Sequence, residues 1–354
     1  MTHRTTFIAI AALAALMASA CTPEEPNEEQ KSNSLFWKID GTTYAETPIL
    51  EECGIKDPYG INVFGSRIYV TTHSNYSANG DVYCFSMSGI RQWKEEAGML
   101  PSKVEPYENA NSNLLAYVLN EGVWGNNDAS LSSVNRASGY ITNNVFRTAN
   151  RRDLGDVAQD ILAYGHKAYL SVTFSNTIEV LDTRNDNSTQ INLNTANPGA
   201  KNPRYIAALD GKVYVTCYDP CSVIRIDTST LTVDAVCPLG GYHPEGIAVA
   251  GGKLVVASSH ISDEHSNFTY DNRLYLIDPA TFSVSGTVEV GLNPVKVKPL
   301  DANRVAVACM GNYDDDPGSA AVVDVVSGSV RQLGKTLYNI DTYEGNIYGY
   351  LSTF

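Results

Sequence analysis

Short runs in which apolar and polar residues alternate recur along the chain, and residues 202–227 show the pattern well. Ile206 and Ala208 belong to a first run, a turn follows at Asp210-Gly211, and the runs 212–216 and 222–226 come next. Alternation with a period of two is typical of a half-buried strand, and Gly, Asn and Asp between the runs favour tight turns. The stretch therefore predicts a meander of antiparallel strands.

Similar units follow one another through most of the sequence. They begin at 57, about 114, 155, 202, 243, 293 and 337, a spacing of about 40–57 residues that is typical of propellers and other repeat arrays. No segment shows a capped apolar period of 3.6. We predict an all-β fold, a seven-bladed β-propeller whose last blade is closed by strands from both termini, because residues 33–50 form no blade of their own. Six or eight blades remain alternatives, since the second unit is irregular.

The two faces of this disc are expected to differ. In a meander, the opening of each unit and the loop after its second strand lie at the same edge of the sheet. The long loops at 72–81, 217–222, 259–273 and 310–319 are all of this second kind, whereas the turns between first and second strands are short. We call the side with the long loops the loop face and the opposite side the turn face. Functional residues are concentrated on such loops.

Polar and aromatic side chains at these positions are candidates for a ligand pocket at the mouth of the central channel. The alternative is that they satisfy one another and water. The candidate ligand-binding residues are Tyr59, His73, Asn120, Glu121, Trp124, Asp156, Gln159, Arg204, Tyr205, Tyr218, His243, Glu245, His260, Lys296, Tyr313 and Asp341.

The chain begins with a segment that does not belong to the propeller. Residues 1–20 have one Arg, a short apolar run and small residues at the end, which is typical of a signal peptide. The stretch 16–21 resembles the lipobox of bacterial lipoproteins, which implies that Cys21 is lipidated; ordinary secretion is the alternative. Residues 21–34 read as a flexible acidic tether, and the propeller occupies 35–354. The acidic start of the tether resembles the signal that places Bacteroidota lipoproteins on the outer face of the outer membrane, and a solvated linker is the other interpretation.

The charge of the chain limits its possible partners, and its cysteines allow disulfide bonds. The net charge is −14, and it becomes −15 when Arg4 leaves with residues 1–20, so nucleic acid is a poor partner for a chain without a basic stripe. Six cysteines remain after Cys21, and an exported chain can oxidise them. Cys217 and Cys221 flank one loop, which makes a local disulfide plausible, and no zinc-binding spacing is present.

The middle of the sequence resembles a known group. Asn120-Glu121-Gly122, Ser130-Leu131, the stretch 154–159 and Asn-Pro-Arg-Tyr-Ile at 202–206 are similar to the YncE-like propeller lipoproteins of Bacteroidota. That group includes surface propellers that capture cobalamin and pass it to a TonB-dependent transporter. Here a whole unit, 57–89, precedes the Asn-Glu-Gly unit, which usually lies close to the mature start. The resemblance therefore assigns no ligand contact to individual residues.

Three classes of function fit these features. A non-catalytic binding module comes first: a surface lipoprotein that captures a nutrient, cobalamin-type or glycan, for TonB-dependent uptake and touches the membrane only through its lipid. The second is a protein-interaction scaffold that docks on a partner such as the transporter. The third is a lactonase-like hydrolase that holds calcium through Asn120, Glu121, Asp156, Glu245 and Asp341. We expect no catalytic residues, no cofactor and no resident metal, with calcium as the exception to test.

Overall fold

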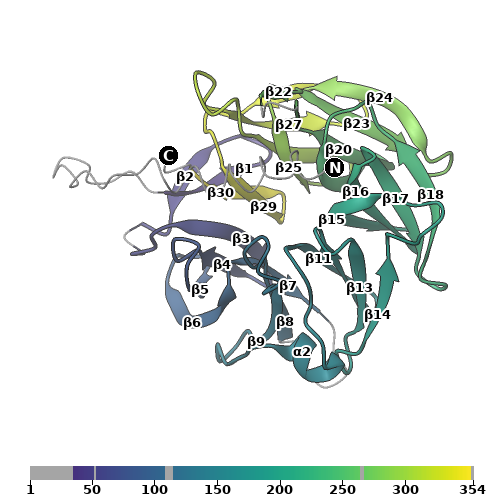
Figure 1. Cartoon of the computed structure of the whole chain (residues 1–354). Coiled ribbons are helices and arrows are strands. Elements are labelled where there is room, and N and C mark those ends of the chain that lie inside the picture. The colour runs from purple at the N-terminus through teal and green to yellow at the C-terminus, as the bar shows by residue number, and fades with distance from the viewer. Residues whose placement is uncertain (1–34, 52, 108–114, 264–266, 352–354) are drawn as a thin grey trace.

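Seven four-stranded antiparallel sheets are arranged around a central axis (Figure 1). The computed structural model describes residues 35–51, 53–107, 115–263 and 267–351. The predicted signal peptide, Cys21 and the tether lie outside these residues. Blades one to three consist of β3 (Pro58–Phe64), β4 (Arg67–Thr72), β5 (Asn79–Ser86) and β6 (Arg91–Met99); β7 (Pro101–Pro106), β8 (Leu115–Asn120), β9 (Ser130–Asn135) and β10 (Ile141–Thr142); and β11 (Ala158–Tyr164), β12 (Lys167–Val172), β13 (Thr177–Asp182) and β14 (Ser188–Asn192).

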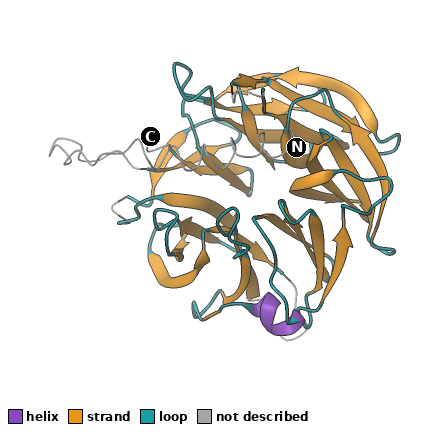
Figure 2. Ribbon diagram, viewed as in Figure 1, coloured by secondary structure: helices purple, strands orange, loops and turns teal. Residues whose placement is uncertain are grey.

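The remaining blades follow the same order from the axis outward. Blades four to six consist of β15 (Lys201–Leu209), β16 (Lys212–Asp219), β17 (Ser222–Asp227) and β18 (Thr232–Pro238); β19 (Pro244–Ala250), β20 (Lys253–Ser258), β23 (Arg273–Asp278) and β24 (Ser283–Glu289); and β25 (Pro294–Pro299), β26 (Arg304–Cys309), β27 (Ser319–Asp324) and β28 (Val330–Gln332). A hairpin of β21 (His260–Ser262) and β22 (Phe268–Tyr270) is inserted in blade five, and the helix α2 (Val145–Asn150) lies at the rim of the disc (Figure 2).

Blade seven joins the two ends of the described chain. Its strands are β29 (Asn339–Tyr343), β30 (Asn346–Tyr350), β1 (Phe36–Asp40) and β2 (Glu46–Ile49). β1 pairs with β30 in antiparallel register, from Phe36 opposite Tyr350 to Asp40 opposite Asn346. The prediction of a seven-bladed all-β propeller closed by both termini is confirmed.

The predicted start of the second unit, at about 114, is wrong. The innermost strand of blade two is β7, which starts at Pro101 directly after β6. β7 does not look like a buried strand, because Lys103 and Glu105 line the central channel and only Pro101 and Val104 of this strand are buried. Asn120 and Glu121 therefore lie at the end of the second strand of blade two and do not open the unit.

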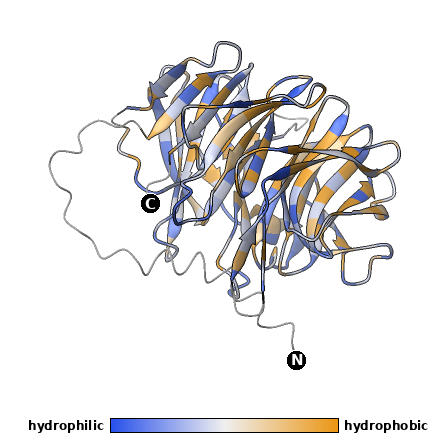
Figure 3. Cartoon of the chain, turned by 90° about the horizontal axis from the view of Figure 1, so that it is seen from above, coloured by the Kyte–Doolittle hydropathy of each residue, from blue (hydrophilic) through white to orange (hydrophobic). Residues whose placement is uncertain are grey.

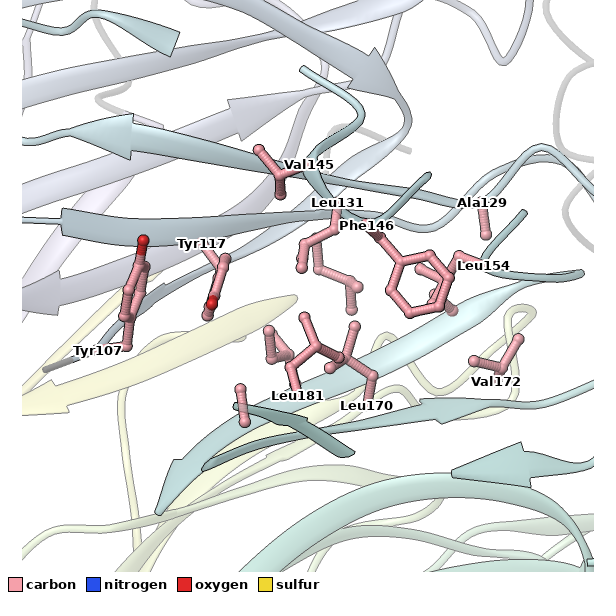
Figure 4. Close-up of a cluster of buried hydrophobic side chains, with 14 residues drawn as sticks. Tyr107, Tyr117, Ala129, Leu131, Val145, Phe146, Leu154, Leu170, Val172 and Leu181 are labelled. Atoms are coloured by element: carbon pink, nitrogen blue, oxygen red, sulfur yellow. The ribbon is translucent and has the colours of Figure 1, made fainter. Parts of the chain in front are cut away.

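The core lies between neighbouring blades. Second strands such as β12 and β26 are buried at five consecutive positions, so both of their faces pack against neighbouring blades. Figure 3 shows hydrophobic residues spread over the strands of the blades. Between blades two and three, the rings of Tyr107 and Tyr117 stack with centroids 3.9 Å apart, beside the buried side chains of Leu131, Phe146 and Leu170 (Figure 4). Full burial of one such aliphatic or aromatic side chain stabilises the fold by about 1.5–3 kcal/mol. A blade is therefore stable only against its neighbours.

The third strand of every blade ends in a side chain that organises the following turn on the turn face. In each case the oxygen of this side chain accepts a hydrogen bond from a backbone N–H two to four residues later, as in Asx turns. The seven residues are Asp40, Ser86, Asn135, Asp182, Asp227, Asp278 and Asp324. This repeated turn fixes where each fourth strand begins.

Candidate functional site

A cavity of about 1010 Å³ runs along the axis of the propeller and is lined by residues of all seven innermost strands. These strands lie very close together: a Cβ atom on Gly60 would be 2.2 Å from the carbonyl oxygen of Ser102, and one on Gly246 would be 2.7 Å from the backbone nitrogen of Val297. Glycine is therefore required at both places. The residues just before these glycines, Tyr59 and Glu245, lie at the end of the cavity on the loop face.

Most innermost strands are entered through a residue with positive φ. Asp57, Leu100, Val157, Asn202 and Asn293 have φ between 54° and 59°, which is unfavourable for residues other than glycine, most of all for the β-branched Val157. All but Val157 are followed by proline. Proline lacks an N–H and is tolerated at the first residue of a strand at the edge of a sheet, which is where each innermost strand lies. This entry brings the next residues to the mouth of the cavity.

Aromatic side chains from six of the seven blades line the cavity on the loop face, and we call this set the aromatic rim. Trp124 and Phe174 form an edge-to-face pair with centroids 6.1 Å apart, and Tyr59 and Tyr76 form another at 6.2 Å. Trp124 is 42% exposed and Tyr313 is 46% exposed. The aromatic rim consists of Tyr59, Tyr76, Trp124, Phe174, Tyr205, Tyr313 and Tyr338. Exposed aromatic faces at a concave site are suited to stacking on a ligand.

A second aromatic group extends this rim over blade five. The ring of His243 stacks on Tyr218 with centroids 4.1 Å apart and lies edge-on to His260 at 5.2 Å. His260 in turn contacts Phe268 and Tyr270 of the β21–β22 hairpin. Burial, together with the positive charge that His260 and Arg204 contribute, lowers the pKa of His243 to about 3. The imidazole of His243 is therefore neutral at physiological pH, and its buried Nδ1 has no hydrogen-bond partner among the described residues.

The centre of the mouth holds a paired charge. The guanidinium of Arg204 donates to the carboxylate of Glu245 at 3.2 Å and also to Gln159, and it lies 4.9 Å from the centre of the Tyr218 ring. The hydroxyl of Tyr218 donates to the same carboxylate. These bonds join blades three, four and five, so Arg204 and Glu245 have a clear structural role whatever they bind.

Two further charged groups at the mouth are not paired in this way. The ammonium of Lys296 donates to the Tyr205 hydroxyl at 2.8 Å and lies 4.6 Å from the centre of that ring. The carboxylate of Glu121 accepts a bond from the Tyr59 hydroxyl at 2.6 Å. Among the described residues, neither group has an oppositely charged atom within 4 Å. Burial raises the pKa of Glu121 and lowers the pKa of Lys296.

Deeper in the channel, charged side chains tie blades together. Asp341 accepts a bond from the backbone N–H of Val63 at 2.8 Å and lies 3.4 Å from Lys298. Lys103 donates to Asp160 at 2.8 Å. Backbone N–H groups donate to a side chain of the preceding blade in the same manner at Val104, Ala163 and Ile206. The carboxylate of Asp341 therefore joins neighbouring blades, and it lies deeper in the channel than the mouth.

The structure divides the predicted site residues into three sets. Those that line the cavity are Tyr59, Glu121, Trp124, Gln159, Arg204, Tyr205, Glu245, Lys296 and Tyr313, with Asp341 deeper. Those that support the rim from behind are His73, Tyr218, His243 and His260.

Asn120 and Asp156 form the third set, which corrects the prediction that they lie at the mouth. The amide of Asn120 is fully buried inside blade two, where it bonds with the Gly98 N–H and with Ser130 and Ser132. Asp156 accepts bonds from the N–H of Gly125 and orders the neighbouring loop. The side chains of both residues therefore hydrogen-bond to groups of the protein itself and not to a ligand in the mouth.

Several residues around the mouth were not predicted from the sequence. Tyr76, Phe174, Phe268 and Tyr270 all lie in loops after the second strand of a blade, but none was singled out as a candidate. The only feature of the sequence that could have indicated them is their position in the loops after second strands, which lie on the loop face.

The predicted disulfide between Cys217 and Cys221 is not formed, and both are free thiols. Cys217 is fully buried among apolar side chains between blades three and four, while Cys221 is half-buried in the turn that leads to β17. Register places Ser222, not Cys221, opposite Cys217.

No group of three or more His, Cys, Asp or Glu side chains is arranged to hold a metal ion within the described ranges. In the same ranges, no helix is both long and apolar enough to cross a membrane.

Comparison with known proteins supports the fold. The chain is similar to hydrazine synthase of Kuenenia stuttgartiensis, with a TM-score of 0.58 and 15% identity over 77% of this chain and 78% of that one. No family model matches the sequence. No curated protein matches it either. At this level of identity the likeness extends to the β-propeller fold alone.

Proposed function

We propose that this protein is a non-catalytic ligand-binding propeller of the YncE-like type. In this proposal it is anchored through a lipid on Cys21 to the outer membrane, faces the cell exterior and captures a nutrient for a TonB-dependent transporter. Corrinoids and glycans are the first ligand classes to test. The observation that carries the proposal is the aromatic rim around the axial cavity of about 1010 Å³.

Two properties of the site support capture of a small molecule. The volume of the cavity is at the upper end of the range for small-molecule sites, about 300–1,000 Å³. Tyr59 and Tyr205 stand on innermost strands, so these two rings lose little conformational entropy when a ligand stacks on them. The rings of Tyr76, Trp124, Phe174 and Tyr313 come from loops between second and third strands. Aromatic faces beside hydrogen-bonding groups such as Gln159 and Tyr205 suit flat or sugar-like ligands.

A protein-interaction scaffold is the second candidate. Trp124, Tyr313 and Ile261 are 42%, 46% and 40% exposed on the loop face. Aromatic side chains of this kind are enriched at protein interfaces. In this alternative the loop face docks on the transporter without a small ligand.

A thermal-shift screen of residues 35–354 distinguishes the two candidates. The closing strands lie within this segment, so the whole ring is retained. A ligand at 100 times its Kd stabilises the protein by about 2.7 kcal/mol, which a melting curve detects. The screen includes corrinoids, neutral glycans and calcium.

Variants then locate the binding site. Trp124→Ala and Tyr313→Ala are expected to weaken ligand binding about 10-fold without lowering the melting temperature of the free protein, because both side chains are exposed. Tyr140→Ala is the matched control, since Tyr140 is 72% exposed in a turn on the opposite face. Absence of a shift with every small molecule, together with binding of the purified transporter to the loop face, would favour the scaffold.

A further inference from the structure

The charges that line the axial cavity are paired with two exceptions. Four cationic and five anionic side chains line it. Arg204 pairs with Glu245, Lys298 with Asp341, and Lys103 with both Asp160 and Glu105. Within the described part of the chain, Lys296 and Glu121 are the lining charges without such a partner, and both lie at the mouth.

These two groups face each other across the channel. Glu121 follows β8 in blade two, and Lys296 lies on β25 in blade six. Blades seven and one separate them on one side of the ring, and blades three to five on the other, which places them on nearly opposite walls (Figure 1). A ligand in the mouth therefore meets a cation on one side and an anion on the other.

Each group is already oriented by a phenol. Tyr205 holds the ammonium of Lys296, and Tyr59 holds the carboxylate of Glu121. An ammonium has three donors and a carboxylate about four acceptor sites, so both keep unused hydrogen-bonding capacity toward the cavity. Burial of a charge is costly, and the raised pKa of Glu121 and lowered pKa of Lys296 show that the more distant opposite charges around them, including their attraction for each other, do not offset this cost. A ligand with complementary charges would remove it.

We propose that the ligand of the mouth is a zwitterion, whose anionic group pairs with Lys296 and whose ammonium group pairs with Glu121. This inference rests on the proposed function and narrows its ligand class. Two sources share the required chemistry: short peptides with free termini, and amino sugars that also carry a carboxylate. In both, the part of the molecule between the charges lies against the aromatic rim.

Titration calorimetry with charge-blocked ligands tests the inference on the unaltered protein. The peptide probes are Ala-Phe-Ala, its N-acetyl form and its C-terminal amide. The sugar probes are muramic acid and N-acetylmuramic acid. If the ligand is a peptide, we expect the free peptide to bind at least about 10-fold more tightly than its blocked forms; if it is an amino sugar, we expect the same of muramic acid over N-acetylmuramic acid. The reason is that each blocked form loses a hydrogen bond between charged groups. Equal binding of free and blocked forms would overturn the inference.

Two variants assign the charges to residues. Lys296→Met is expected to abolish the preference for the free carboxylate, and Glu121→Gln the preference for the free amine. Lys298→Met is the control, since this lysine lines the same channel but pairs with Asp341 and should leave both preferences intact. If a corrinoid or a neutral glycan binds and no zwitterion does, the inference fails and the proposed function stands. If no small molecule binds, both fail.

Discussion

The guanidinium of Arg204 in blade four donates to the carboxylate of Glu245 in blade five at 3.2 Å, with 13% and 7% of the two side chains exposed. Removal of one partner of a buried pair leaves an uncompensated charge, which typically costs about 3–5 kcal/mol. We therefore expect Arg204→Met to lower the free energy of unfolding by about 3 kcal/mol. The double variant Arg204→Met/Glu245→Met should lose less than the two single losses combined. Equilibrium urea unfolding measures both, and a loss below about 1 kcal/mol for Arg204→Met would contradict a role in joining the blades.

His243 makes stability depend on pH. Its pKa is about 3 in the folded protein and about 6.5 in the unfolded chain, so the unfolded state binds more protons between these values. This residue therefore reduces stability as pH falls from about 6.5 toward 3, by up to about 1.4 kcal/mol per pH unit. His243→Phe keeps a ring against Tyr218 but cannot titrate. We expect its melting temperature to fall less between pH 7 and pH 4.5 than that of the unaltered protein.

The control for this pH experiment is His166→Phe, which changes an exposed histidine in a turn on the opposite face. It should retain the pH dependence of the unaltered protein. If His243→Phe and the unaltered protein lose the same number of degrees over this pH range, His243 does not cause the dependence.

The side chain at the end of each third strand should contribute measurably to stability. Asn135 accepts bonds from the N–H groups of Ala137 and Ser138 at 3.0 and 3.2 Å. Asn135→Ala removes both, and we expect a loss of about 1 kcal/mol in the free energy of unfolding. Asn126→Ala, in an exposed loop of the same blade, is the matched control and should change it by less than about 0.5 kcal/mol. Equal effects of the two substitutions would show that the turn is not stabilised by its side chain.

Closure of the ring should be essential for a cooperative fold. Phe36 and Ile39 on β1 are completely buried, and β1 provides the partner of β30. A chain that begins at residue 35 should unfold in one sharp transition, whereas a chain that begins at residue 51 should lack this transition and be cleaved rapidly by protease. Near-ultraviolet circular dichroism and limited proteolysis measure the difference. Retention of a sharp transition by the shorter chain would mean that six blades suffice.

The fold was predictable because turns and alternating strands repeat, and the one misplaced boundary has a physical cause. The sequence of β7 does not indicate a strand, because a strand at the axis exposes polar side chains to the channel and has little apolar periodicity. A different signal was present. Proline is the first residue of the innermost strand at 58, 244 and 294 and the third at 203, and proline also stands at 101, where β7 begins. Because proline has no N–H to donate, it marks the strand that faces the channel.

The candidate site was predictable in position more than in composition. Tyr59, Glu245 and Lys296 were identified from their place at the start of a unit, and they do line the mouth. Phe174 was not, because a single aromatic residue in a loop carries no periodic signal. Asn120 was assigned to the mouth although its amide is consumed inside blade two. The sequence shows where a polar residue lies in a repeat, but it does not show which neighbouring group forms hydrogen bonds with its side chain.

The pairing of β1 with β30 also has a consequence for synthesis. It joins residues 36 and 350, so the first strand of the described chain must wait for the last one before the two can pair. Contacts so distant in sequence form slowly, because the entropy of bringing the ends together is lost before the pairing stabilises them. Until then the edges of β1 and β30 lack their partners and are exposed to wrong pairing. Protection of these edges during biogenesis, by chaperones or by rapid delivery of the finished chain, is therefore a requirement that the architecture imposes.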